Sequence, residues 1–245
     1  MALLEIQGVS KRFGGVRALN DVSLQVAAGQ VVGLIGPNGA GKTTLFNVVA
    51  GVLRPEAGRV LFHGRDVTGL PPHAVCHAGI ARTFQIVQPF SRLSVVENVV
   101  AGYLFGRRGA RGMGRAAAET EAHGLLEHGK LAAKAGWPAG TLTLSERKRL
   151  EMVRALATGP DLLLLDEVLA GLNPQETEEM AGIIQRLGRE LGLAIILIEH
   201  NVRAVMTLSE QVVVLNYGTV IARGDPATVA RDPAVIAAYL GDRRQ

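Results

Sequence analysis

The chain has 245 residues, of which 48% are hydrophobic and 20% charged, and its formal net charge is +4. This is the composition of an ordinary globular protein, and the length allows one large α/β domain or a core with one inserted subdomain. No run of about 18 apolar residues is present, which excludes a helix that spans a bilayer by itself. The single cysteine, Cys76, excludes an internal disulfide, and with no signal-peptide pattern we expect a cytoplasmic protein.

Residues 3–35 are expected to form β-structure. Val22, Leu24 and Val26 alternate with polar residues, at the period of a strand with one buried face. Ahead of them, Phe13 stands beside two glycines and is therefore an aromatic residue on a predicted turn. Such a side chain either packs in the core or stacks on a base, and the local sequence leaves both interpretations open.

The apolar residues 31–35 are followed by a glycine-rich segment with the pattern G-x-x-x-x-G-K-T and then by helix-like residues 45–50. Strand, glycine-rich loop and helix in this order are typical of a phosphate-binding P-loop. The backbone N–H groups would converge on a polyphosphate, with Lys42 reaching its β- and γ-phosphates and Thr43 ligating Mg²⁺. We therefore predict a nucleoside triphosphate site formed by Gly36, Pro37, Asn38, Gly39, Ala40, Gly41, Lys42, Thr43 and Thr44.

A short helix is expected after Pro71 and Pro72, because proline is favoured in a first helical turn. On it, His73, Cys76 and His77 would share one face, as metal ligands sometimes do. No fourth ligand is near in sequence, so we interpret this segment as an ordinary surface helix.

The middle of the chain changes from β to helical character. A strand over residues 80–85 ends in Gln85, Ser94 is expected to cap a helix over 95–104, and a second helix covers about 116–126. A third helix is expected to begin with Ser145 as its N-cap. We predict that residues 86–158 form a helical subdomain inserted into a core made of 1–85 and 159–245.

Residues 106–115 contain four arginines and four glycines with no acidic residue, which predicts a flexible loop. A loop of this composition can contact nucleic acid or anionic lipid, although it lacks the aromatic residues of a base-stacking surface.

Residues 161–167 predict a fully buried parallel strand that ends in Asp166 and Glu167. A helix over 174–191, a strand over 193–198 that leads to His200, a hairpin and two terminal helices follow. Carboxyl ends of parallel strands meet at one ligand crevice, so Asp166 is expected to hold Mg²⁺ and Glu167 to polarise the attacking water. No guanine-selecting motif occurs, which favours ATP.

These motifs together resemble an ABC-type ATPase subunit over essentially the whole chain. The resemblance identifies residues 36–44 as Walker A, Gln85 as the Q-loop, 162–167 as Walker B and His200 as the switch histidine. It implies an α/β fold with a P-loop NTPase core, an antiparallel β-subdomain and an inserted helical subdomain, and it makes Phe13 the residue that stacks on adenine. The D-loop would be Ala170, Gly171, Leu172 and Asn173.

The signature sequence departs from the family pattern L-S-G-G-Q. It would comprise Leu142, Thr143, Leu144, Ser145 and Glu146, with side chains in place of both glycines and a carboxylate in place of the glutamine. Thr143 keeps a hydroxyl for the γ-phosphate of a partner's nucleotide. We expect the composite site completed by this signature to be weak, which favours a heterodimer with a related subunit.

Within the family, residues 11–15, 171–174, 198–200 and 238–241 resemble the ATPase subunits of branched-chain amino acid importers. The resemblance implies that ATP and Mg²⁺ are bound, that Glu167, His200 and Gln85 are catalytic, and that Thr43, Gln85 and Asp166 surround the metal. It implies as partners a second ABC ATPase subunit, an integral membrane permease seated on about residues 86–98 and, indirectly, a periplasmic solute-binding protein, with no nucleic acid. The subunit would lie on the inner face of the membrane through the permease.

Three alternatives remain at this stage. The chain could serve a lipid or lipopolysaccharide exporter, it could be a soluble ABC protein without a membrane partner, or it could be a P-loop kinase. A P-loop kinase would not explain why Gln85, Asp166, Glu167 and His200 all occur at the expected ends of strands.

Overall fold

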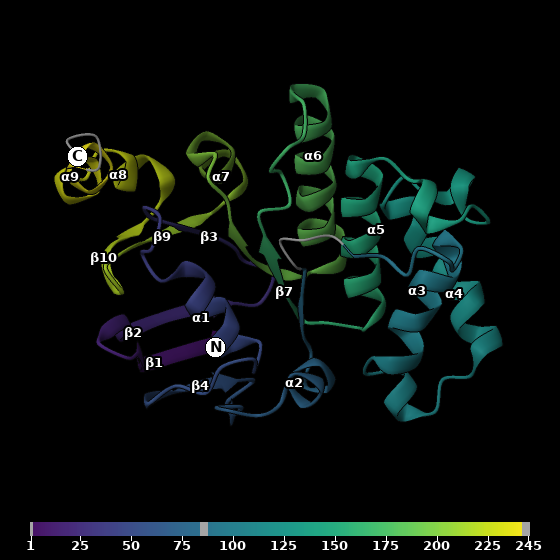
Figure 1. The fold of residues 1–245 in the computed structure, drawn as a ribbon, viewed down its shortest axis with the longest axis horizontal. Helices are drawn as coiled ribbons and strands as arrows, with labels where there is room; N and C mark the ends of the chain where they lie inside the picture. The colour runs from purple at the N-terminus through teal and green to yellow at the C-terminus, as the bar shows by residue number, and fades with distance from the viewer. Residues whose placement is uncertain (1, 84–87, 242–245) are drawn as a thin grey trace. The chain divides into compact units, whose positions relative to one another are not determined.

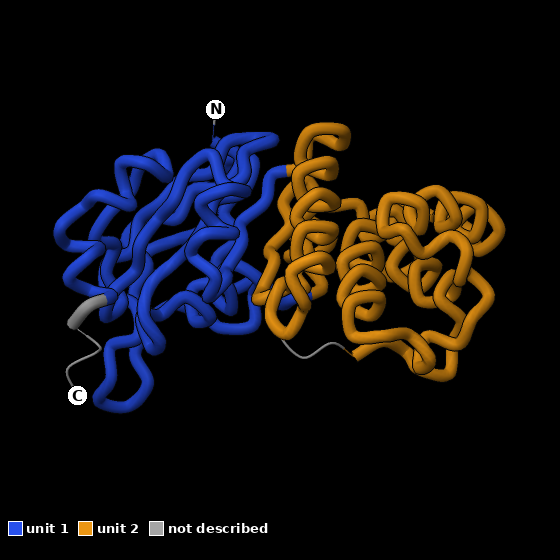
Figure 2. Tube along the Cα trace, turned by 90° about the horizontal axis from the view of Figure 1, so that it is seen from above, with its two compact units in different colours: residues 1–72, 194–245 blue, residues 73–193 orange. Residues whose placement is uncertain are grey.

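The fold was analysed in a computed structural model, which describes residues 2–83 and 88–241. The chain divides into two compact units (Figure 2). Unit 1 comprises Met1–Pro72 and Ala194–Gln245, and unit 2 comprises His73–Leu193. The segment 86–158, predicted to be helical, lies within unit 2.

Unit 1 contains an antiparallel sheet with the strand order β2-β1-β4-β5. Its strands are β1 (Ala2–Phe13), β2 (Val16–Ala27), β4 (Ala57–Phe62) and β5 (Arg65–Asp66). In β2 the predicted alternation is confirmed, because Val22, Leu24 and Val26 are buried while Ser23 and Gln25 are exposed. The antiparallel β-subdomain expected from the sequence is therefore present.

The other strands of unit 1 form a second sheet around the central strand β3 (Val31–Ile35), all of whose residues are buried. Strands β8 (Ala194–Ile198) and β9 (Gln211–Asn216) run parallel to β3 on its two sides, and β10 (Thr219–Gly224) forms the expected hairpin with β9. A Cβ atom on Gly33 would lie 2.2 Å from Cγ1 of Val205, so glycine is required where helix α7 (Val202–Leu208) packs on β3. Helix α7 was not predicted.

The other helices of unit 1, among the residues that the structure describes, follow β3 or lie near the end of the chain (Figure 1). Helix α1 (Lys42–Val49) follows β3, and α8 (Pro226–Ala230) and α9 (Pro233–Gly241) are the predicted terminal helices. The last two lie beside the β9–β10 hairpin.

Unit 2 contains a parallel strand pair and one long helix outside its helical part. Strand β6 (Ile80–Arg82) pairs with β7 (Leu162–Asp166), with Arg82 opposite Leu164. Helix α2 (Pro72–Ala78) precedes β6, and α6 (Pro174–Leu191) has the predicted bounds.

The helical part of unit 2 consists of α3 (Val95–Phe105), α4 (Arg115–His128) and α5 (Leu144–Ala157), joined by short 3₁₀ turns. The three helices share one apolar core, to which Val99, Leu126 and Leu150 contribute fully buried side chains. Ser94 caps α3 as predicted, in a capping box with Glu97. The prediction for α5 was wrong, because Thr143 rather than Ser145 is its N-cap.

The arginine- and glycine-rich segment 106–115 is more ordered than its composition predicts. Gly109–Arg111 forms a 3₁₀ turn. Arg107 pairs with Asp161 at 2.8 Å, Arg108 pairs with Glu121, and Arg115 lies 3.8 Å from Glu97. The acids come from elsewhere in unit 2, which is why the local sequence did not reveal them. Among the described residues, no helix is both long and apolar enough to cross a membrane.

Candidate functional site

The loop between β3 and α1 depends on two glycines. Gly36 has φ 151°, and a Cβ atom there would lie 2.0 Å from the carbonyl oxygen of Leu215. Gly41 has φ 103°, and its Cβ would lie 2.4 Å from the carbonyl oxygen of Ala18. Both glycines let the loop turn against neighbouring backbone where any side chain would clash. The tight turn expected of a phosphate-binding loop is present.

Lys42 lies across this loop. It is 7% exposed, and its Nζ donates hydrogen bonds to the carbonyl oxygens of Gly36 at 2.6 Å and Pro37 at 2.9 Å. Helix α1 begins at Lys42, and its N-cap Gly41 offers no side-chain acceptor to the first N–H groups. Such N–H groups bind anions readily. Thr43, in the first turn, is exposed.

His200 follows strand β8, which is the parallel neighbour of β3. Leu34 is opposite Ile198, so the loop after β3 and the residues after β8 leave the same edge of the sheet. Glu199 is 4% exposed, whereas His200 is exposed. Unit 1 thus places His200 and the loop after β3 at one edge of its sheet.

Phe13 ends strand β1 and is 48% exposed. The ammonium of Lys11 lies 5.7 Å from the centre of its ring. Of the two interpretations left open by the sequence, core packing does not fit, because about half of the side chain is accessible.

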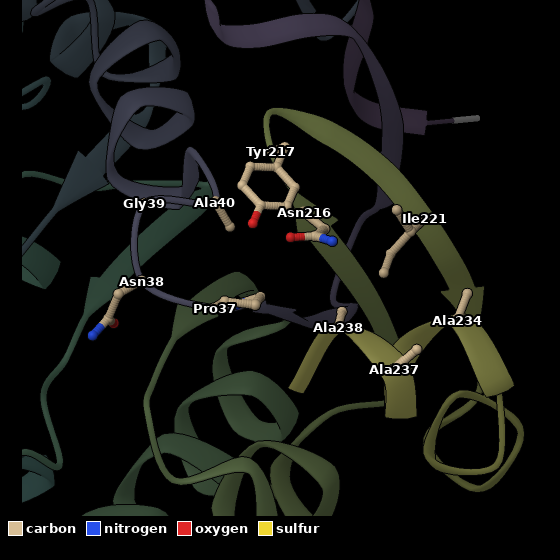
Figure 3. A pocket seen from close by; sticks show the side chains of 10 residues that line it. All are labelled: Pro37, Asn38, Gly39, Ala40, Asn216, Tyr217, Ile221, Ala234, Ala237 and Ala238. Atoms are coloured by element: carbon tan, nitrogen blue, oxygen red, sulfur yellow. The ribbon is translucent and has the colours of Figure 1, made fainter. Parts of the chain in front are cut away.

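Residues 37–40 of this loop line a cavity of about 530 Å³, whose lining side chains are drawn in Figure 3. Its walls come from the loop, from the β9–β10 hairpin and from α9, and include Pro37, Ala40, Asn216 and Ala238. Burial raises the pKa of Tyr239, although a hydrogen bond with the Gly36 backbone acts in the opposite direction. Helix α9 therefore lies beside the loop after β3, a proximity that sequence reasoning missed.

In unit 2, strands β6 and β7 end beside one another and position Asp166. The Asp166 carboxylate, 2% exposed, accepts a hydrogen bond at 2.7 Å from Nη2 of Arg82. Thr83 links the two strand ends, since its N–H donates to the Leu164 carbonyl at 2.9 Å and its Oγ1 accepts from the Asp166 N–H at 3.2 Å. Arg82 was not among the predicted site residues. Gln85 lies outside the described residues.

Glu167 directly follows Asp166 and adopts a left-handed backbone conformation, with φ 52°. Such a conformation is rare for a residue with a side chain and is often found at functional sites. The turn is closed by a hydrogen bond from the Ala170 N–H to the Glu167 carbonyl at 3.3 Å. Lys148 of α5, 5% exposed, donates to the same carbonyl at 2.9 Å and to that of Ala170 at 2.6 Å.

The D-loop residues lead from this turn into α6. Asn173 is the N-cap of α6. Its Oδ1 accepts a hydrogen bond from the Glu176 N–H at 2.9 Å, and the Glu176 carboxylate accepts one from the Asn173 N–H at 3.0 Å. Asparagine is among the best N-cap residues, so Asn173 suits this structural role.

The signature residues form the beginning of α5. The Thr143 hydroxyl accepts a hydrogen bond from the Glu146 N–H at 3.3 Å, and the Glu146 carboxylate accepts one from the Thr143 N–H at 3.0 Å. Lys134 pairs with Glu146 at 2.6 Å. Burial tends to raise the pKa of Glu146, but the hydrogen bonds from Lys134 and from the Thr143 backbone outweigh it, and the pKa is lowered. The groups at this helix start are thus engaged with one another, and Leu142 and Ser145 are each 3% exposed.

Comparison with known proteins gives consistent matches. A family model described as ABC transporter matches residues 19–170, and one described as branched-chain amino acid ATP-binding cassette transporter matches residues 219–244. The high-affinity branched-chain amino acid transport ATP-binding protein BraF of Pseudomonas aeruginosa is 41% identical over 98% of both chains, and LivG of Escherichia coli K12 is 39% identical over the same share. The crystal structure of an ATP-binding cassette of an ABC transporter in its ADP conformation aligns with a TM-score of 0.87 at 32% identity, covering 98% of this chain and 99% of the other.

Proposed function

This chain belongs to the family of ABC transporter ATP-binding subunits, and from that membership we propose that it powers the uptake of branched-chain amino acids or similar small solutes. Its family couples ATP hydrolysis to transport. The uptake of branched-chain amino acids is supported by relatives with that function in their names, which match over 98% of both chains. The match of residues 219–244 to the branched-chain family model supports it independently.

ATP is assigned to the loop of residues 36–44, where the turn geometry of Gly36 and Gly41 and the start of α1 suit a polyphosphate. Phe13, half exposed at the end of β1, would stack on the adenine. Lys42, already held across the loop by the Gly36 and Pro37 carbonyls, would neutralise phosphate charge. This loop is the observation that carries the assignment.

Thr43 and Asp166 offer a hydroxyl and a carboxylate, the hard oxygen ligands that Mg²⁺ prefers. When bound, Mg²⁺ neutralises charge on the β- and γ-phosphates. We assign the attacking water to Glu167, whose carboxylate would accept a proton as the water oxygen attacks the γ-phosphorus and the bond to ADP breaks. His200, together with Gln85, would contact the γ-phosphate.

The permease is assigned to the segment that follows Gln85. Phe90 is 52% exposed and Leu93 38% exposed. The fully buried Asn98 fixes this segment, because its side chain accepts a hydrogen bond from the Phe90 N–H at 2.8 Å and donates to the Phe90 carbonyl at 3.2 Å. Exposed apolar side chains on a fixed backbone suit a short helix of a membrane protein. Through it, the subunit would act at the inner face of the membrane, with a periplasmic solute-binding protein as an indirect partner.

A related second ATPase subunit is the partner favoured by the signature. Thr143 and Glu146 already bond to one another, and Leu144 and Ser145 carry side chains where close backbone approach needs glycine. The nucleotide completed by this signature would turn over slowly, while the chain's own Walker residues would serve the other site.

Glu167→Gln tests the assignment. We expect this variant to bind ATP, to form a trapped dimer with the related subunit and to lose turnover by at least a hundredfold. In cells lacking the gene, wild type should restore uptake of labelled leucine, and Glu167→Gln should not. Full ATPase activity of the wild-type chain alone would count against the heterodimer, and normal leucine uptake in the absence of the gene would count against the solute.

A further inference from the structure

We propose that Lys148 is a positioning residue for the hydrolysis reaction and that it fixes the backbone on which Glu167 stands. The proposal rests on the function assigned to Glu167 above. Lys148 lies on α5, is 5% exposed and contacts the carbonyl oxygens of Glu167 and Ala170 at 2.9 and 2.6 Å. A buried ammonium is costly unless it is well hydrogen-bonded, and these carbonyls supply charge-assisted hydrogen bonds.

The two carbonyls bracket one turn. The Ala170 N–H already bonds to the Glu167 carbonyl at 3.3 Å, and the ammonium holds the same turn from the side of α5. Glu167 itself is in the left-handed region, at φ 52°, which a residue with a side chain keeps only when its surroundings enforce it. Lys148 supplies part of that enforcement and thereby directs the Glu167 carboxylate.

The same helix carries the signature residues at its first turn. Thr143 caps α5, and a Cβ atom on Gly171 would lie only 3.3 Å from Cδ2 of Leu144. The start of α5 therefore contacts the D-loop, and Lys148, one turn later, contacts the turn that carries Glu167. If a second subunit's nucleotide displaced α5, the displacement would therefore shift the backbone of Glu167, the catalytic glutamate proposed for this chain.

An alternative is that Lys148 only stabilises the packing of α5. The two interpretations differ in their kinetics. A positioning residue acts after ATP has bound, so its loss should lower kcat and leave KM for ATP unchanged. A residue that only stabilises the fold should lower the amount of folded protein and leave kcat per folded molecule unchanged.

The test compares Lys148→Met, Lys148→Arg and Lys130→Met in the full chain assembled with its partner subunit. Lys130 is a matched control, since its ammonium pairs with Glu179 at 2.6 Å in the same unit but the side chain is 46% exposed. For Lys148→Met we expect kcat to fall at least tenfold, with KM and ATP affinity within twofold of wild type and faster hydrogen exchange in residues 167–172. Lys148→Arg, which can also donate to two carbonyls, should recover at least half of kcat, and Lys130→Met should match wild type.

Wild-type kcat in Lys148→Met would overturn the inference, as would a loss of kcat that only follows the loss of folded protein. If Lys148→Met fails to fold, Lys148→Leu, which likewise has no N–H donor, replaces it with the same expectations. Glu167→Gln is measured alongside. If that variant is inactive while Lys148→Met turns over normally, only the positioning of Glu167 by Lys148 is wrong, whereas normal turnover in Glu167→Gln would remove the assigned function of Glu167 and the inference together.

Discussion

The buried ion pair of Arg82 and Asp166 allows a quantitative prediction for Arg82→Met. The two side chains are 9% and 2% exposed and are joined at 2.7 Å. Removing one partner of such a pair leaves a buried charge uncompensated and costs about 3–5 kcal/mol. At roughly 2–4 °C per kcal/mol for a chain of this size, the melting temperature should fall by about 6–20 °C. The same substitution removes the Arg82 hydrogen bond from the Asp166 carboxylate, so the position of this carboxylate is expected to be less defined.

The matched control is Arg107→Met, which removes an ion pair of similar length, 2.8 Å, from the same unit. Its side chains are 26% and 37% exposed, so solvent screening limits the expected cost to about 1 kcal/mol or less. Calorimetry of both variants, together with Asp166→Asn and the double variant Arg82→Met/Asp166→Asn, gives the coupling between Arg82 and Asp166. Equal melting temperatures for Arg82→Met and Arg107→Met, or a coupling near zero, would refute the reasoning.

Two further predictions concern the start of α5. Replacing Leu144 and Ser145 by glycine and Glu146 by glutamine should raise the ATPase rate of the chain assayed without its partner. Each glycine should lower the free energy of unfolding by about 1 kcal/mol. An unchanged ATPase rate would mean that the signature sequence does not limit turnover at this site. Because the pKa of Glu146 is lowered in the folded state, this carboxylate stabilises the fold above its ordinary pKa of 4.5, and the stabilisation is lost as the pH falls through the lower folded value. Below pH 4.5, the free energy of unfolding of the wild type should therefore fall more steeply with decreasing pH than that of Glu146→Gln.

The parts of the fold that follow from local sequence were predicted well. The P-loop, the buried strand before Asp166 and the helix over 174–191 each depend on residues that are adjacent in the chain. The predicted N-cap of α5 was wrong, although the sequence contained the signal for the correct one. Thr143 is followed three residues later by Glu146, as a capping box requires, whereas the residue three positions after Ser145 is Lys148.

The contacts that position the acids could not have been predicted in this way. Arg82 and Asp166 are 84 residues apart in sequence, and Lys148 lies 19 residues from Glu167. The ion pairs of the arginines in residues 106–115 also join distant parts of the chain, since Arg107 pairs with Asp161. Periodicity and motif spacing describe what one segment does, and these ion pairs and hydrogen bonds form only when the units fold. The assignments of Phe13, Gln85, the metal ligands and the catalytic residues remain predictions.

The divergent signature and the lysine on its helix lead to one interpretation of α5. In its first turn, Thr143 and Glu146 accept hydrogen bonds from each other's N–H groups, and Lys134 pairs with the Glu146 carboxylate. This helix start therefore presents fewer N–H donors to a phosphate than a glycine-rich helix start would. Yet Lys148 keeps the same helix bonded to the Glu167 turn, and that link does not depend on the signature glycines. We therefore expect that substitutions in the first turn of α5 alter the partner's nucleotide site, whereas substitution of Lys148 alters this chain's own. A heterodimer in which each subunit is mutated separately distinguishes the two sites, because only the Lys148 effect should disappear when Glu167 of the same chain is already glutamine.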